Sequence, residues 1–475
     1  MTQQESSSYA TFNEQVHQHL FVMAAPAARF RQTLSAPGLI QKLRSSFSQV
    51  PDTRDAKNVL HIMPDTLMAA FAMFNLKYPS MLRFDTEAHA DPRLIHNLKT
   101  LFGLNGVPSD TQMRTILDPV KPEALRPCFE SLHHELQRGK VLEDFVALEN
   151  YYLLAIDGTG QFASNKISCP HCCVKNRSNG TKEFYHQILA AVMVHPDQKT
   201  VLPLAVEPIT KRDGDNKNDC ERNAAKRLLA YLADAFGQRQ FLVIEDALAS
   251  NGPHIELLYK LGMDFILGVK PDGNEKLFEQ VLRRQCDNTL LEYNSEVAED
   301  GSCHGYRLTN GLSLNDSHPD LLVNYVEHWE IDKRDAQGND GKQHIFSWVT
   351  SLEVTIENVR DIACAGRTRW RVENETFNVL KNQGYEFEHN YGHGKQYLSS
   401  TLAVMMMLSF LVDQIQEHSC RVFQQARKSR GTKKTLWMQM RVMMTTFRIP
   451  DWQTYMALLI DPDTVSMQTG YADSG

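Results

Sequence analysis

The spacing of hydrophobic residues changes at about residue 150. Before that point apolar positions recur at helical intervals, as in the stretch PDTLMAAFAMFNLKYPS, and Ser109 or Asp110 is placed to cap a short helix. After it the chain carries continuous apolar runs of strand length, beginning with YYLLAID at Tyr151. Residues 1–150 are therefore expected to form a helical N-terminal domain, which is a candidate for DNA binding.

Three strand candidates follow one another after this change, namely YYLLAID, YHQILAAVMVHP and TVLPLAVEPI. Helical and strand patterns then alternate: an amphipathic helix precedes QFLVIED, and a shorter helix precedes DFILGVKP. Adjacent strands followed by such alternation are typical of an α/β sheet domain. Residues 151–274 are expected to form the first part of this domain.

The second half of the chain divides into three further segments. Residues 275–352 alternate short strand patterns with Gly, Asn and Asp clusters, which predicts a β-rich insertion. Residues 353–418 return to helical spacing and complete the sheet domain. Their apolar run LAVMMMLSFLV is too short to cross a bilayer, so it is expected to be a buried helix and no membrane partner is expected. Residues 419–475 form a C-terminal region with a charge pattern of its own.

Charge adds a local feature to this picture. The 475-residue chain has a net charge of -7, so its overall charge does not point to nucleic acid. The stretch from Arg421 to Pro450, however, contains eight Lys or Arg and no Asp or Glu. This basic stretch predicts contacts with DNA phosphates, or alternatively a solvated helix face. The candidate DNA contacts are Arg427, Lys428, Lys433 and Lys434.

Cysteine usage and the N-terminal sequence indicate the compartment. The nine cysteines are an odd number scattered over a long chain, which favours a reducing cytoplasm over a disulfide framework. The first residues lack the basic and apolar regions of a signal peptide. We therefore expect a cytoplasmic protein.

Two aspartates end apolar strand patterns. Asp157 closes LLAID, and Asp246 closes FLVIED. In an open α/β sheet, ligands bind where strands end, because the loops open there and side chains can converge. Each aspartate taken singly is also compatible with simple turn chemistry.

A third acid is expected on the helix predicted over residues 369–382. At about 100° per residue, Glu373 falls in an apolar arc with Trp370, whereas Glu375 falls opposite, beside Arg371. A carboxylate on a buried stripe is costly unless it is paired or binds a metal, so Glu373 is the stronger candidate. Glu375 remains an alternative third acid.

Asp157, Asp246 and Glu373, in this order and these settings, resemble the catalytic DDE triad of bacterial insertion-sequence transposases. The stretch RWRVENETFNVLK is similar to the Tyr–Arg–Glu–Lys signature of one large group of these enzymes, and Arg369 and Glu373 match its spacing. The resemblance covers roughly residues 150–400. It implies a ribonuclease H-like mixed sheet with flanking helices, interrupted by a β-rich insertion.

Two positions depart from the signature. Gly366 stands where the family has tyrosine, and Lys381 lies one residue beyond the family's lysine. Arg369 and Lys381 are nevertheless the residues expected to offset DNA backbone charge.

The resemblance implies a DNA transposase that cleaves and joins DNA strands. Its triad would bind Mg²⁺ or Mn²⁺, hard cations that prefer oxygen ligands. Its partners would be double-stranded DNA, comprising the terminal inverted repeats of its own element and a target, and a second copy of the chain in a dimer associated with the bacterial nucleoid. A nuclease of the same fold that does not join strands, and a non-catalytic DNA-binding relative, remain alternatives. The sequence contains no G-x-S-x-G elbow and no P-loop lysine motif, which disfavours a serine hydrolase and an ATPase.

A cysteine-rich loop follows the first strand. In SCPHCCVKNRSNG, Cys169 and Cys172 have the C-x-x-C spacing of half a zinc site. Structural zinc and ordinary free thiols both remain open. Candidates for the missing ligands are His186, Cys220 and the pair Cys303–His304.

Overall fold

The computed structural model describes residues 33–211, 220–237, 239–294, 302–331 and 341–462. The outer parts of the expected N-terminal and C-terminal segments, residues 1–32 and 463–475, lie outside this range. The chain forms two compact units.

Each unit is built from segments that are distant in the sequence. Within the described residues, unit 1 comprises residues 33–142, 164–171 and 379–462, and unit 2 comprises residues 143–163 and 172–378. The expected helical segment 353–418 is therefore divided between the two units, a grouping that hydrophobic spacing did not predict.

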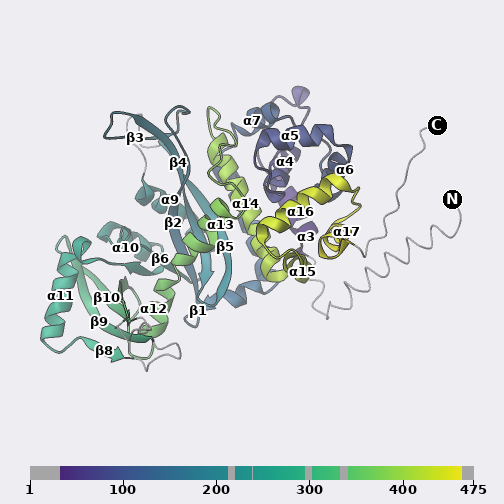
Figure 1. Cartoon of the computed structure of the whole chain (residues 1–475). Coiled ribbons are helices and arrows are strands. Elements are labelled where there is room, and N and C mark those ends of the chain that lie inside the picture. Colours follow the sequence, from purple (N-terminus) through teal and green to yellow (C-terminus); the bar gives the residue numbers. More distant parts are fainter. Residues whose placement is uncertain (1–32, 212–219, 238, 295–301, 332–340, 463–475) are drawn as a thin grey trace, which may run out of the picture. The chain divides into compact units, whose positions relative to one another are not determined.

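Unit 1 is helical, and in Figure 1 its purple N-terminal helices lie among its yellow C-terminal helices. The expected cap at Ser109 is present: its side chain and that of Gln112 form a capping box at the start of a helix. The helices of this unit are α3 (Ala36–Phe47), α4 (Met63–Asn75), α5 (Met81–Ala90), α6 (Pro92–Phe102), α7 (Asp110–Leu117), α8 (Arg126–Arg138), α14 (Leu398–Ser419), α15 (Arg421–Ser429), α16 (Lys433–Thr446) and α17 (Trp452–Ile460).

Helix α14 is the centre of unit 1. Every residue from Leu398 to Gln416 is buried, and α14 packs against α3, α4, α7 and α8. It is the one helix among the described residues whose length and composition would suffice to cross a membrane, and its apolar window is fully buried inside the protein. The predicted buried helix is thus confirmed.

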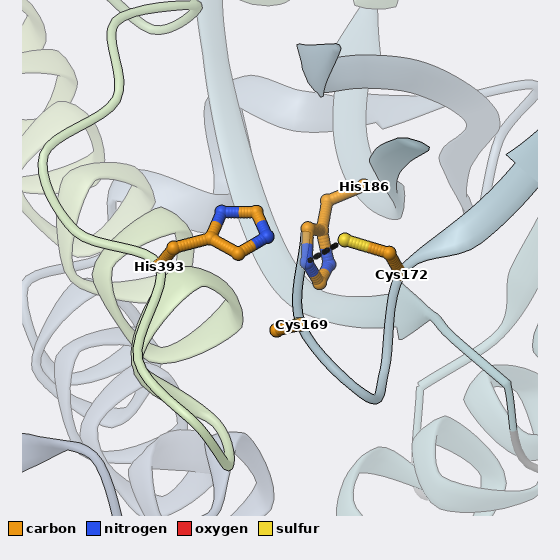
Figure 2. Close-up of side chains that lie close together, drawn as sticks. All are labelled: Cys169, Cys172, His186 and His393. Carbon is orange, nitrogen blue, oxygen red and sulfur yellow. Dashed lines mark hydrogen bonds between the residues drawn. The ribbon is translucent and has the colours of Figure 1, made fainter. Parts of the chain in front are cut away.

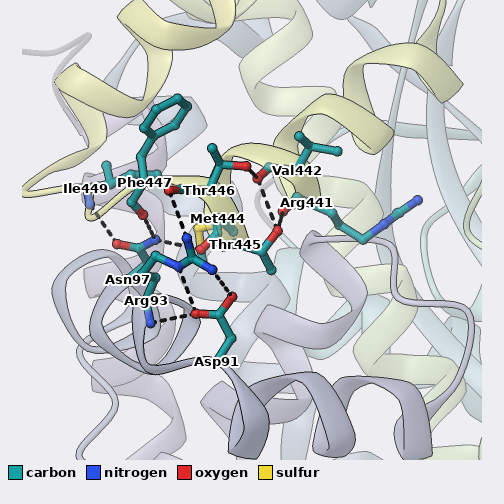
Figure 3. Close-up of polar contacts among 10 residues, drawn as sticks. All are labelled: Asp91, Arg93, Asn97, Arg441, Val442, Met444, Thr445, Thr446, Phe447 and Ile449. Carbon is teal, nitrogen blue, oxygen red and sulfur yellow. Dashed lines mark hydrogen bonds and ion pairs between the residues drawn. The ribbon is translucent and has the colours of Figure 1, made fainter. Parts of the chain in front are cut away.

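The side chain of Asn97, on α6, forms hydrogen bonds with the backbone of α16 and of the residues that follow it (Figure 3). Its amide nitrogen donates to the carbonyls of Met444 at 2.8 Å and Phe447 at 2.7 Å, and its amide oxygen accepts from Ile449 N at 2.7 Å. Because the side chain is fully buried, these three bonds satisfy polar groups that water does not reach.

A buried ion pair lies beside α14. Lys77 Nζ contacts Asp413 Oδ2 at 2.6 Å, and the Tyr385 hydroxyl donates to the same oxygen at 2.5 Å. The ammonium also lies 4.3 Å from the centre of the Trp437 ring. The pair joins the end of α4 to α14 within unit 1.

Unit 2 contains an 11-stranded mixed sheet with the strand order β3-β4-β2-β6-β7-β11-β10-β9-β8, in which β1 also pairs with β2 and β5 with β4. Strands β2, β6 and β7 run parallel to one another, whereas β4–β5 and the pairs from β7 to β8 are antiparallel. The strands are β1 (Val146–Ala147), β2 (Tyr151–Ser164), β3 (Cys173–Asn176), β4 (Lys182–His195), β5 (Gln198–Ile209), β6 (Phe241–Glu245), β7 (Asp264–Gly268), β8 (Leu291–Asn294), β9 (Cys303–Asn315), β10 (His318–Ile331) and β11 (Gln343–Thr350).

Four helices in the described part of unit 2 pack on the sheet, and a fifth, short helix follows them. Helix α9 packs on β4 and β5, α10 on β7, α11 on β9, and α12 on β7, β9 and β10. Their bounds are α9 (Glu221–Phe236), α10 (Gly252–Lys260), α11 (Glu275–Cys286), α12 (Val359–Arg367) and α13 (Asn378–Asn382), the last of which crosses the boundary between the units. The mixed α/β class is confirmed, and the strands predicted within 275–352 are present as an extension of the same sheet beyond β7.

The predicted single helix over residues 369–382 is wrong in its geometry. The segment contains a π-helix, η5 (Val372–Phe377), between α12 and α13. Since i→i+5 hydrogen bonds advance each residue by a smaller angle than an α-helix, a wheel drawn at about 100° per residue misplaces the side chains. Trp370, expected in the buried arc, is 53% exposed, whereas Val372, Phe377, Val379 and Leu380 of the same arc are buried as expected.

Candidate active site

Strands β2 and β6 set the first two acids side by side. In their parallel pairing, Ala155 lies opposite Ile244. Two residues further along each segment are Asp157, within β2, and Asp246, which directly follows β6, and both aspartates line the same cavity. Because neighbouring strands are about 4.8 Å apart, the two aspartates lie near each other at the C-terminal end of β6.

Arg369 joins Asp157 to Glu373. Its Nη1 atom lies 2.8 Å from Asp157 Oδ2 and 2.9 Å from Glu373 Oε1. Two carboxylate oxygens therefore contact the same nitrogen, and the helical segment after α12 meets β2 at this point. Arg369, expected to face DNA, is engaged with the two acids.

Asp157 occupies a setting that disfavours its charge. Burial raises the pKa of its carboxyl to about 6, and the neighbouring Glu373 carboxylate contributes to the rise. The Arg369 guanidinium and the Gly158 N–H, which donates to Asp157 Oδ1 at 2.8 Å, act in the opposite direction. The Asp157 carboxyl is therefore easier to protonate than an exposed aspartate.

The two glutamates of the π-helix differ from their expected settings. The side chain of Glu373 is 53% exposed, so its expected position on a buried stripe is wrong, although it does reach Asp157 through Arg369. The expected exposed pair between Arg371 and Glu375 is not formed among the described residues, because Arg371 donates to the carbonyl of Pro196 instead. Proximity to Asp157 thus favours Glu373 over Glu375 on different grounds from the helix wheel.

Glu221 is a further acid at this site that the sequence reasoning missed. It begins α9, and a Cβ on Gly158 would lie only 2.5 Å from its Oε1 atom, so the carboxylate lies directly against the backbone next to Asp157. Burial, followed by the charge of Asp246, raises the pKa of Glu221. No strand or helix pattern singles it out, since an acid in the first turn of a helix is commonplace.

A cavity of 470 Å³ opens beside these acids. Asp157, Glu221 and Asp246 contribute to its lining together with Tyr185 on β4 and His254 on α10. Glu373 is not among the lining residues and meets Asp157 from outside the cavity. A concave, acid-lined site of this kind suits a hard cation and a phosphate group better than an apolar ligand.

The other candidate DNA contacts lie in unit 1. Lys381, on α13, pairs with Glu388 at 2.8 Å. Among the residues of the basic stretch, Lys428 and Lys434 are exposed, whereas Lys433 and Arg427 are partly buried, and Arg427 donates to the carbonyl of Gly431. Helices α15 and α16 bury apolar side chains on their other faces, including Phe423, Leu436 and Trp437.

The two cysteines of the loop each have a histidine nearby within their own unit (Figure 2). In unit 2, Cys172 Sγ lies 3.4 Å from Nε2 of His186, a residue of β4. In unit 1, donor atoms of Cys169 and His393 lie within 4.8 Å of one another. His186 was among the expected partners and His393 was not.

The remaining candidates for a zinc ligand have other surroundings. Cys220 lines the acidic cavity, and His304 lies near His328 and Glu330 on β10, where Glu330 is bound by Arg367. The structure therefore brings His186, rather than Cys220 or His304, to the cysteine loop.

No model of a known protein family matches the chain, and no curated protein matches its sequence. The functional argument accordingly rests on the geometry of the site.

Proposed function

We propose that the chain is a DNA transposase in which Asp157, Asp246 and Glu373 bind the catalytic metal ions. The observation that carries the proposal is the convergence of acids from separate elements: Asp157 on β2 and Asp246 just after β6 line one cavity, and Glu373 shares a nitrogen of Arg369 with Asp157. Acids brought together from separate elements repel one another, so their proximity does not help folding and supports a role in binding a cation.

A ribonuclease H-like core is part of the same proposal. Its support is the strand order β4-β2-β6-β7, with β5 paired to β4, in which β6 and β7 alternate with helices and run parallel to β2. The strands β8–β11 extend this sheet as the β-rich insertion that the resemblance implies.

The donor set fits Mg²⁺ or Mn²⁺. Carboxylate oxygens are the ligands these ions prefer, and the contact of Arg369 with both Asp157 and Glu373 marks a place where positive charge is stabilised. When bound, a pair of such ions activates the attacking oxygen and stabilises the leaving one. Glu221, against Gly158 and close to Asp246, adds further negative charge to the same place.

The roles of the protein's own residues follow from this arrangement. Asp157 must lose its proton before it can bind a cation. Until a cation binds, Arg369 orients the carboxylates of Asp157 and Glu373. The cavity beside the two aspartates receives the scissile phosphate. Water as the attacking group gives a cut strand, and a DNA 3′-hydroxyl gives strand transfer.

The partners proposed for this activity are the inverted-repeat ends of the protein's own element, a target duplex and a second copy of the chain. The working compartment would be the bacterial cytoplasm, at the nucleoid. The exposed Lys428 and Lys434 support DNA binding because cations in a stretch of chain free of acids attract phosphates.

Cleavage and joining of DNA test the proposal. Full-length protein is incubated with Mg²⁺, a target plasmid and labelled duplexes taken from the sequences that flank the gene. Glu373→Gln is expected to abolish cutting and joining while leaving the gel-shift affinity unchanged, because the side chain keeps its size and loses its charge. Glu375→Gln, two residues away with the same chemical change, is the matched control and should remain active.

Each alternative outcome has a definite meaning. Cutting without joined products would make the chain a nuclease, and binding without cutting by the unaltered protein would make it a non-catalytic relative. An active Glu373→Gln beside an inactive Glu375→Gln would transfer the third metal ligand to Glu375.

A further inference from the structure

Two histidines and a glutamate form a cluster on the β-rich extension of the sheet, within unit 2. His304 on β9 pairs directly with Glu330 on β10, and His328 lies two residues before Glu330 on the same strand. Directly opposite residues, and residues two apart on one strand, project from the same face of a sheet, so the three side chains share one face. The proposed DNA chemistry does not use any of them.

The possible metal-ligand atoms of this cluster converge. His304 Nδ1 lies 3.2 Å from His328 Nε2 and 3.9 Å from Glu330 Oε2, and the three ligand atoms all lie within 4.8 Å of one another. Zn–N and Zn–O bonds are about 2.0–2.2 Å long, so two ligand atoms of one zinc ion are at most about 4.3 Å apart. Both distances from His304 Nδ1 are therefore short enough for one ion to bridge.

His328 lies in a row of aromatic side chains. The centre of its ring is 4.8 Å from that of Tyr306 on β9 and 6.2 Å from that of Phe346 on β11, and the residue is 5% exposed. Within the described part of the chain, its Nδ1 atom has no hydrogen-bond partner. A phenyl ring would fill this place without burying an unpaired polar atom, so the imidazole is explained by a role for its other nitrogen, Nε2, which faces His304.

Neighbouring groups orient the other two side chains of the cluster. Ser302 Oγ lies 3.2 Å from His304 Nε2, and when it accepts the Nε2 proton, Nδ1 presents its lone pair to the cluster. Arg367, on α12, donates to Glu330 Oε2, and its guanidinium lies 4.3 Å from the centre of the Phe346 ring. A carboxylate has lone pairs for both an arginine and a metal ion, and such outer partners are typical of metal ligands.

We propose that His304, His328 and Glu330 bind one zinc ion. Two imidazoles and one carboxylate are a ligand set of zinc, whereas Mg²⁺ prefers oxygen ligands, so this ion differs from the cations proposed for the acidic cavity. The side chains of His304 and Glu330 are 29% and 18% exposed, so solvent reaches the cluster. The fourth position of a tetrahedral ion is therefore available for water.

The zinc content of the full-length protein tests the site. The protein is purified without chelators and without a metal-affinity column, and zinc is measured by mass spectrometry of the elements. His304→Asn and Glu330→Gln should each contain about one zinc per chain less than the unaltered protein, whatever zinc other residues hold. His318→Asn, on the same strand as His328, and the exposed Glu353→Gln are the matched controls and should lose none.

Replacing His304 by cysteine distinguishes loss of a ligand from loss of the fold. Cysteine is itself a zinc ligand, so His304→Cys should keep the ion. After exchange with Co²⁺, the spectrum of His304→Cys should gain a thiolate-to-cobalt charge-transfer band that the unaltered protein lacks at this site. Equal zinc in the unaltered protein and His304→Asn, the result expected if the two rings share only a hydrogen bond, would overturn the proposal. A His304→Cys spectrum without the additional band would overturn it as well.

Discussion

At the scale of single residues, the partly buried Asp157 carboxylate contacts the Arg369 guanidinium, which also contacts the Glu373 carboxylate. Its pKa, raised by burial from the usual 3.8 to about 6, means that folding favours the protonated form. The contribution of this group to stability is therefore greatest at low pH and is lost as the pH rises through about 6. At neutral pH the partly buried Asp157 carboxylate of the folded protein is charged, and a bound metal ion would stabilise that charge.

The upward shift of the Asp157 pKa gives a prediction for metal binding. Mg²⁺ competes with a proton for Asp157, so the rise in melting temperature on adding Mg²⁺ should be small at pH 5 and should reach its full size above about pH 7. Differential scanning fluorimetry with and without Mg²⁺ measures it. In Asp157→Asn the Mg²⁺-dependent rise should be lost at every pH; an equal rise in the unaltered protein at pH 5 and pH 8 would contradict the prediction.

At the scale of elements, the basic helices α15 and α16 present Lys428 and Lys434 to solvent. Replacing both by glutamine should weaken binding to every DNA sequence alike and should reduce the slope of log K against log salt by about 1.8, if each contacts one phosphate. The measurement is fluorescence anisotropy at several salt concentrations. Lys121→Gln with Lys140→Gln, which removes two exposed lysines elsewhere, is the control.

An unchanged salt slope in the Lys428 and Lys434 variant would make the stretch an ordinary solvated face. Arg427 is the poorer choice for such a test, because it caps the turn after α15 by donating to the carbonyl of Gly431.

Individual elements also show what hydrophobic spacing can predict. The existence of β2 and β6 follows from continuous apolar runs, which are typical of strands with buried faces, but β2 continues seven residues beyond its expected end at Asp157, to Ser164. The π-helix does not follow from spacing, since its widened turn depends on hydrogen bonds that no residue pattern specifies. Glu221 was missed for a related reason: it reaches the acidic cavity through tertiary contacts and carries no local signal of its own.

At the scale of the whole molecule, the grouping of residues 379–462 with the N-terminal helices depends on contacts between distant segments. The pair of Lys77 and Asp413 is one of these, and burial disfavours both charged forms, lowering the pKa of Lys77 and raising that of Asp413. Removing one member leaves the other charge without its counter-ion in the core.

Asp413→Ala should therefore destabilise unit 1 by about 3–5 kcal/mol, whereas Lys77→Met combined with Asp413→Leu should cost much less. Urea unfolding followed by Trp437 fluorescence reports on the pair directly, since the ammonium lies 4.3 Å from that ring. Asp272→Asn, an exposed acid in unit 2, should change stability by less than about 0.5 kcal/mol. A double variant as unstable as Asp413→Ala would show that lost packing, rather than an unpaired charge, is responsible.

The buried position of α14 has a consequence for how the protein is made. Helices α3, α4, α7 and α8 leave the ribosome long before α14, against which they pack, and all of unit 2 is synthesised in the interval. Throughout translation of that middle portion, the early helices expose the apolar faces that α14 later covers. The nascent chain is thus expected to depend on chaperones until its last hundred residues emerge, and synthesis arrested before α14 should yield aggregates rather than a smaller working protein.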